Sequence, residues 1–264
     1  MRGIELPAQL LIVCLLLHLR FVGLVFSAPV FTSVMAPTPV RYLFAALLTF
    51  SAAGGLGGAE VPLLYFDSVF SITLLGVREV LIGVALGFLS ALPLVALRVA
   101  GEQVGTVIGF SMAQVLDPTT QTESSIIGQL EFLVGLWFYY HWNGHLLMIQ
   151  AVMESVRLAP VGRLLPFPPD LIEVGTWLQD LFILAMRITL PFFCSLVLAD
   201  VGLGFLARTV PQMNIFVLGL PIKVALGFMV LAAVLPLTVD LIYTQFERWI
   251  EFALEGVLPW SAAP

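Results

Sequence analysis

The chain has 264 residues, of which 60% are hydrophobic and only 11% are charged, and its formal net charge is -6 at pH 7. Its mean hydropathy of +1.05 lies far above that of soluble domains, which are about 45–50% apolar and about 25% charged. The composition therefore predicts an integral membrane protein, and with a single lysine, Lys223, it excludes a basic surface for nucleic acid.

Six apolar segments follow one another along the chain, and breaks rich in proline or glycine separate most of them. Each is long enough for a spanning helix, which needs about 20 predominantly apolar residues. The pattern predicts an all-α membrane protein with kinked helices. The six segments are residues 6–28, 40–59, 69–97, 126–153, 176–206 and 213–243.

The first segment begins like a secretion signal, because Arg2 precedes an apolar run. However, His18 and Arg20 interrupt the run, and Pro29 directly after Ala28 makes a poor cleavage site. We therefore predict a retained first segment. Cys14, in this segment, and Cys194 both lie in apolar runs and are predicted to be buried free thiols, although the sequence leaves a disulfide open.

The fourth segment carries Asn143-Gly144 near its middle, a dipeptide that favours a turn. A helical hairpin with arms at 126–140 and 145–156 is one interpretation, and an uninterrupted helix is the other. His141 and His145 have the spacing of a helical metal site, but Trp142 stands where the HExxH motif needs its glutamate. Polar tips at a membrane interface are the favoured interpretation. No motif supports catalysis or a bound cofactor.

Several charged residues fall inside or at the ends of the apolar runs, where a charge at the bilayer centre costs about 2.5–3.5 kcal/mol. Such groups usually face other protein or water, so they predict either salt bridges within the chain or pairs across subunits. Arg98 and Glu102, four residues apart, and Asp180 and Arg187, seven apart, could each share a helix face. The charged residues within the runs are Arg20, Arg78, Glu79, Glu131, Arg187, Asp200, Lys223 and Asp240.

Arginines in the loops do not fix an orientation in the membrane. If all six segments crossed, four arginines would lie on one side and three on the other: Arg2, Arg157, Arg163 and Arg248 against Arg41, Arg98 and Arg208. A four-to-three split is too small a difference to set the topology by the positive-inside rule. It suggests that simple serpentine crossing is the wrong picture.

The stretch from Ala100 to Gln129 is rich in Gly, Ser, Thr and Gln, although it lies between two strongly apolar segments. Irregular backbone at membrane depth is tolerated only where protein buries it or where it lines a water-filled cavity. Gly105 and Gly109 lie next to bulky apolar residues such as Phe110 and Met112, which suits a deformable hydrophobic closure. From composition alone, an ordinary buried connector is the favoured interpretation, because most loops between spans are connectors.

The chain resembles the FliR family of the flagellar export gate, whose counterpart in virulence type III secretion is the SctT family. The resemblance runs along nearly the whole chain and depends on the order and spacing of short motifs. These are Ser27-Ala28-Pro29, Arg41, Gly83, Gly87-Phe88, Ala100-Gly101-Glu102, Gly105, Gly109, Asp117-Pro118, Asn143-Gly144-His145, Pro160, Gly162, Leu190-Pro191, Gly202-Leu203-Gly204, Arg208, Pro211-Gln212, Ile215-Phe216, Gly219-Leu220-Pro221 and Lys223.

This resemblance implies one copy of the chain in a hetero-oligomer with FliP and FliQ homologues, with FlhB joining it, FlhA nearby and unfolded export substrates passing through. It implies a FliP-like helical portion over 1–165, a FliQ-like hairpin over 170–255, which agrees with the proline-rich break at 166–169, and a tail over 256–264. The expected location is the inner membrane, in contact with lipid, in the flagellar basal body, with much of the gate raised toward the periplasm.

The resemblance also implies a loop at about 105–125 that plugs the passage, and charges that meet neighbouring subunits or are buried. A SctT-type virulence role and a secondary transporter are the alternative functions. The expected plug residues are Gly105, Gly109, Phe110, Ser111, Met112, Ala113, Gln114, Val115, Leu116, Asp117 and Pro118, and the expected charged residues are Arg78, Glu79, Arg98, Glu102, Asp200, Arg208 and Lys223.

Overall fold

The computed structural model describes residues 2–32, 37–55, 69–109, 125–162, 171–210, 212 and 215–255. Within these ranges every regular element is a helix, which confirms the all-α prediction. The helices are α1 (Arg2–Ser27), α2 (Pro29–Thr32), α3 (Thr38–Gly55), α4 (Val69–Ile108), α6 (Ile126–His141), α7 (Gly144–Leu158), α8 (Leu171–Thr209) and α9 (Ile215–Glu255).

Three of these helices are much longer than an ordinary globular helix: α4 has 40 residues, α8 has 39 and α9 has 41. Each contains proline, which removes one helical hydrogen bond and favours a kink: Pro93 in α4, Pro191 in α8, and Pro221 and Pro236 in α9.

Among the residues that the structure describes, three helical stretches are long and apolar enough to cross a membrane, not six. They are Val69–Ile108, Gly175–Thr209 and Val217–Trp249, and a shorter apolar helix covers Leu11–Ser27. The fourth predicted segment does not qualify because it is divided into α6, with 16 residues, and α7, with 15. A full crossing needs about 20.

The division between α6 and α7 lies at Asn143, whose backbone is in the left-handed region with φ 56° and ψ 30°. The uninterrupted helix is therefore wrong, and the predicted break at Asn143-Gly144 is confirmed. Asn is one of the few residues that adopts this conformation readily. That the two arms form a hairpin stays a prediction.

The chain forms two compact units, and each combines segments that are far apart in the sequence. The first contains residues 1–91, 142–173 and 246–264, and the second contains 92–141 and 174–245. The predicted division between a FliP-like portion and a FliQ-like hairpin lies at residues that are outside the described ranges, and it stays a prediction.

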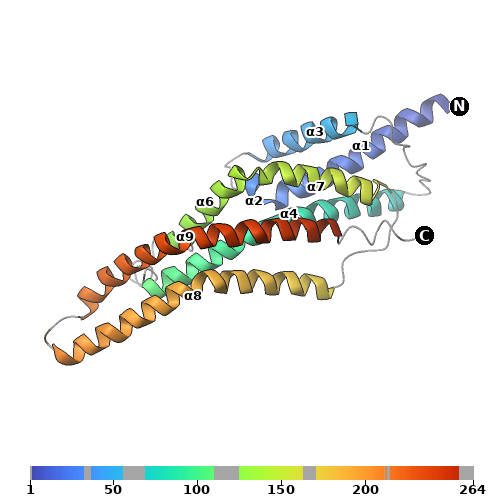
Figure 1. Cartoon of the computed structure of the whole chain (residues 1–264). Helices are drawn as coiled ribbons and strands as arrows, with labels where there is room; N and C mark the ends of the chain where they lie inside the picture. The colour runs from blue at the N-terminus through green and yellow to red at the C-terminus, as the bar shows by residue number, and fades with distance from the viewer. Residues whose placement is uncertain are drawn as a thin grey trace. The chain divides into compact units, whose positions relative to one another are not determined.

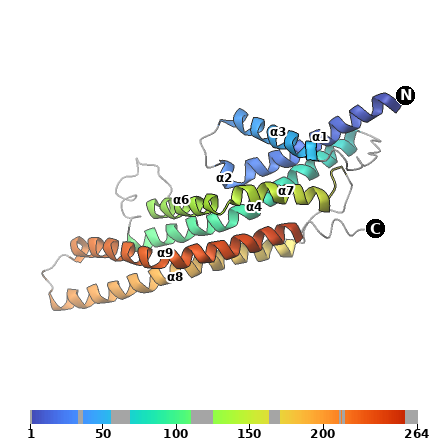
Figure 2. The same ribbon diagram turned by 45° about the horizontal axis from the view of Figure 1, so that its top comes forward.

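In the first unit, α1 crosses the N-terminal half of α4 at a glycine contact. A Cβ built on Gly23 would lie 2.9 Å from the backbone nitrogen of Val84, and one built on Gly83 would lie 2.9 Å from that of Leu24. The two backbones come this close only because neither glycine has a side chain. The α3 helix lies along α1 (Figures 1 and 2), and Nδ1 of His18 is 3.3 Å from the Thr49 hydroxyl.

In the second unit, α8 and α9 lie side by side (Figures 1 and 2), and the C-terminal part of α4 packs with them and with α6. The core is a cluster of apolar side chains from three helices, and α9 contributes partly buried residues around it. The buried members are Val104, Ile108, Ile127, Phe192 and Leu196.

The prediction for the cysteines is partly wrong. Both are free thiols, but Cys14 is only half-buried and Cys194 is exposed. Cys194 is exposed because it lies on a face of α8 that no other part of the described chain covers.

Candidate functional site

Unit 1 buries a charged cluster that joins three parts of the chain. Arg20 on α1 lies 2.6 Å from a carboxylate oxygen of Glu79 on α4, and neither side chain is exposed to solvent. The guanidinium also donates to the Ser155 hydroxyl at 3.0 Å and to the Ala159 carbonyl at 2.9 Å. One arginine thus holds α1 to α4 and to the end of α7.

The second oxygen of Glu79 completes the cluster. It accepts a hydrogen bond from the Gly162 amide at 3.4 Å and lies 3.6 Å from the guanidinium of Arg78. Buried charges are tolerated when they are paired and hydrogen-bonded. Arg78 and Glu79 are both buried, and they pair within the chain, as in the first of the two predicted alternatives. A contact of either residue with another subunit stays a prediction.

The remaining predicted charges lie nearer the surface. Arg98 and Glu102 form the expected pair along α4, with 3.1 Å between Nε and Oε1, and both are about half exposed. Arg208 is exposed in the last turn of α8, where a positive charge complements the carbonyl end of the helix.

Lys223 and Asp200 join the two helices of the predicted C-terminal hairpin. The Lys223 ammonium on α9 lies 2.6 Å from Oδ1 of Asp200 on α8, and the lysine side chain is 22% exposed. A role for Lys223 or Arg208 between subunits stays a prediction.

Most of the predicted plug, from Phe110 to Pro118, lies outside the described residues, but both ends of the loop are described. Gly109 follows the end of α4 with φ 103°, a conformation that favours glycine. At the other end of the loop, where the described residues resume, Ser125 lies against Gly105. A Cβ built on that glycine would be 3.2 Å from the serine Cβ. The loop therefore leaves and rejoins the second unit at one place.

Glu131 is a site residue that the sequence did not single out beyond its charge. It lies on α6 in unit 2 with only 5% of the residue exposed, and its Oε2 atom makes no hydrogen bond to any residue that the structure describes. The backbones of α4 and α6 come very close at two glycines, because a Cβ on Gly101 would be 2.7 Å from Cα of Gly128. This contact, one helical turn from Glu131, holds α6 against α4 beside the carboxyl.

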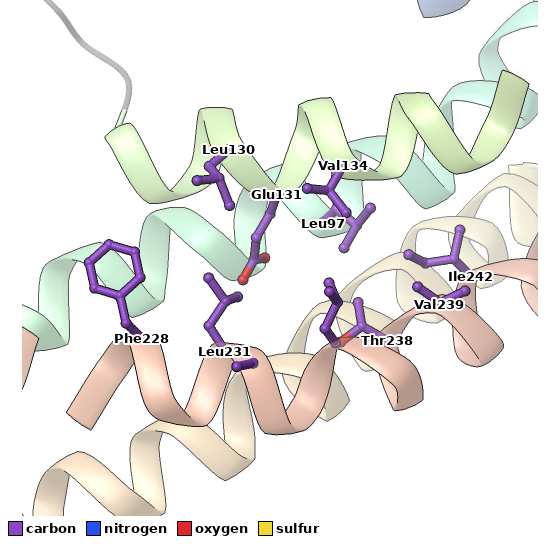
Figure 3. Close-up of a pocket in the computed structure, with 11 residues that line it drawn as sticks. Leu97, Leu130, Glu131, Val134, Phe228, Leu231, Thr238, Val239 and Ile242 are labelled. Carbon is purple, nitrogen blue, oxygen red and sulfur yellow. The ribbon is translucent and has the colours of Figure 1, made fainter. Parts of the chain in front are cut away.

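The Glu131 carboxyl faces a cavity of about 240 Å³ between α6, α4 and α9 (Figure 3). Among the described residues that line it, Thr238 is the one polar residue besides Glu131, and the Thr238 hydroxyl donates to the Val234 carbonyl of its own helix at 3.1 Å. The 16-residue α6 is not one of the three candidate spans. Burial raises the pKa of Glu131 to about 8, because a carboxylate is poorly solvated there.

The described residues contain no group of three or more His, Cys, Asp or Glu side chains that could hold a metal ion. His141, which with His145 has the spacing of a helical metal site, stacks on Trp137 with ring centroids 5.4 Å apart. This contact agrees with a polar tip beside aromatic residues.

Comparisons with known proteins give a consistent result over most of the chain. Residues 11–249 match the family model described as bacterial export proteins, family 1. The chain is 31% identical to flagellar biosynthetic protein FliR of Bacillus subtilis (strain 168), over 92% of this chain and 95% of that protein. It is 30% identical to FliR of Escherichia coli (strain K12), over 83% and 82% of the two chains. It is also 30% identical to the secretion system apparatus protein SsaT of Salmonella typhimurium, over 65% and 69%.

Proposed function

The chain belongs to family 1 of the bacterial export proteins, the FliR family that its motifs resemble, and from this premise we propose that it is a subunit of a flagellar protein export apparatus. The observation that carries this proposal is the similarity to FliR over 92% of the chain. The similarity to SsaT covers less of the chain, which favours flagellar use over virulence secretion.

We place the protein in a membrane as a structural component of the apparatus, not as an enzyme. Its long apolar helices support a membrane location. The finer location that we propose is the bacterial inner membrane at the flagellar basal body, with part of the gate raised toward the periplasm.

The proposed assembly contains one copy of this chain with homologues of FliP and FliQ, in contact with FlhB and FlhA. Large apolar side chains are exposed along α8 and α9 in the isolated chain, among them Phe182, Phe193, Phe205 and Met229. Apolar surface of this extent requires lipid or other protein chains to cover it. Helices of neighbouring subunits would cover part of it.

Within this assembly, the chain would line part of a passage for unfolded export substrates, and the loop at 105–125 would close it at rest. The geometry that supports this proposal is the contact between Gly105, in the last turn of α4, and Ser125, where the described chain resumes after the loop. A loop held at both ends can block an opening without leaving it, and apolar side chains exclude water from a narrow passage.

Deleting Phe110 to Leu116 tests the plug. We expect the deletion to raise the ion conductance of membranes that contain the assembled complex, while FliP and FliQ homologues still co-purify with the chain. A matched control replaces the same residues by a Gly/Ser sequence of equal length, which separates loss of apolar bulk from shortening of the loop. Unchanged conductance in a correctly assembled deletion variant would refute the plug but not the assembly.

A further inference from the structure

The Glu131 cavity in the second unit is an incomplete site. Figure 3 shows the carboxyl pointing from α6 toward α9, between Leu97 of α4 and Leu231 of α9. The nearest polar residue in the lining, Thr238, already donates its hydroxyl to its own helix. No lining residue supplies a hydrogen-bond donor to Oε2 of Glu131.

A carboxyl buried in this way destabilises the isolated chain. A buried polar group without a partner costs about 1–3 kcal/mol, and an ionised one costs more. A sequence that only needed to fill this space would be more stable with leucine at the position. The carboxyl therefore requires an explanation outside the fold of this chain.

Several apolar residues that line the cavity are exposed on the surface of the isolated chain, as residues of a helix–helix interface are before the partner helix binds. Leu130 and Phe228, which line it, are 37% and 47% exposed, and Leu235 is 37% exposed. These exposed apolar residues surround a single buried acid, so the matching surface is apolar with a single basic group.

We propose that this cavity receives a helix of a neighbouring protein chain, and that an arginine or lysine on that helix pairs with Glu131. Long basic side chains suit the site because their apolar stems lie along hydrophobic surface while their charged ends form the ion pair. A charged donor also satisfies the carboxylate more strongly than a neutral one. The inference rests on the proposed function, because it requires that the chain works inside an assembly.

A photocrosslinker at the mouth of the cavity tests the occupant in native membranes. Phe228→p-benzoylphenylalanine keeps an aromatic ring at the site, and Leu130→p-benzoylphenylalanine is a second probe if the first variant folds poorly. We expect a crosslink to an apolar segment of another protein that carries Arg or Lys within one helical turn of the attachment point. Adducts with lipid alone, or with a segment that lacks a basic residue, would overturn the proposal.

The acid itself is tested by combining the probe with Glu131→Leu. We expect the crosslinking yield at the cavity to fall about tenfold, the effect of losing one charge-assisted hydrogen bond. Trp137→p-benzoylphenylalanine is the matched control, because Trp137 is 62% exposed on the same helix but does not line the cavity. Its yield should not change.

Co-purification and the Phe228 probe together separate the inference from the proposed function. If FliP and FliQ homologues co-purify with the chain and the yield at Phe228 is unchanged by Glu131→Leu, the ion pair is overturned while the assembly stands. If no other protein co-purifies with the otherwise unchanged chain and the Phe228 probe gives no protein crosslink, the assembly is refuted and the inference is overturned with it.

Discussion

Each of the two compact units buries a glutamate on a helix, but the chain treats the two acids in opposite ways. Glu79 in the first unit has contacts with Arg20, Arg78 and the Gly162 amide. Glu131 in the second unit faces apolar side chains, and its Oε2 has no partner in the described part of the chain. Unit 1 satisfies its buried carboxylate internally, whereas unit 2 leaves a buried carboxyl for which the described chain supplies no donor to Oε2. This is the group that the proposed neighbouring helix would pair with.

The largest effect is expected from removing the central arginine of the first unit. Arg20→Ala leaves Glu79, Ser155 and the Ala159 carbonyl without their main donor. Breaking a buried ion pair from one side costs about 3–5 kcal/mol, so we expect a strongly lowered thermal midpoint in detergent, measured by tryptophan fluorescence.

Arg98→Ala is the control for that measurement, since Arg98 and its partner Glu102 are about half exposed. An exposed pair of this kind contributes about 0.3–0.5 kcal/mol. If Arg20→Ala were as mild as Arg98→Ala, the cluster would not be what holds the first unit together.

The next effect concerns the helix crossing that brings Arg20 to Glu79. Gly83→Ala puts a methyl group within 2.9 Å of the Leu24 amide nitrogen, and we expect the crossing to open at a cost of about 1–3 kcal/mol. Gly202→Ala is the matched control, because a Cβ there meets nothing within 4 Å, and it should stabilise α8 by up to about 1 kcal/mol. Both are measured by thermal unfolding, and equal effects would contradict the close crossing.

The third effect is a dependence of the free energy of unfolding on pH, caused by Glu131. The pKa of the carboxyl is raised from its ordinary value of 4.5 to about 8, so between these values the folded chain keeps a proton that the unfolded chain has lost. The free energy of unfolding should therefore be highest below pH 4.5 and should fall as pH rises toward 8. Thermal midpoints of the isolated chain across this range measure the effect.

Glu131→Leu should remove that fall and raise the free energy of unfolding at pH 7 by about 1–3 kcal/mol, because it removes a buried polar group without a partner. Glu102→Leu is the control, since the Glu102 side chain is 42% exposed. A pH profile that keeps its slope in Glu131→Leu would mean that other groups cause the dependence.

The sequence predicted the helices well and the sites less completely. The ends of α3 at Gly55 and of α8 at Thr209 lie beside the predicted glycine and proline breaks, and Asn143-Gly144 located the division between α6 and α7, because these signals are local. In contrast, α4 continues to Ile108 and α9 to Glu255, beyond the predicted ends at 97 and 243. The partner of Arg20 could not be predicted, since Glu79 lies 59 residues away in the sequence and the contact depends on how α1 crosses α4.

Glu131 illustrates the same limit more strongly. The sequence shows a charge in an apolar run, which indicates a cost, but it does not show whether a partner is present. That answer depends on the approach of Gly101 to Gly128 and on which residues of α9 face the cavity. Both are properties of the folded chain.

The smallest effect is expected at the ion pair of Asp200 with Lys223. Like Glu79, Asp200 has a partner within the chain, but its side chain is 48% exposed. Asp200→Asn should lower the free energy of unfolding by only about 0.2–1 kcal/mol, because solvent screens the pair. Raising the salt concentration should reduce the difference between variant and parent further. A loss as large as that of Arg20→Ala would mean that unit 2 also depends on an internal ion pair, and the contrast between the two units would fail.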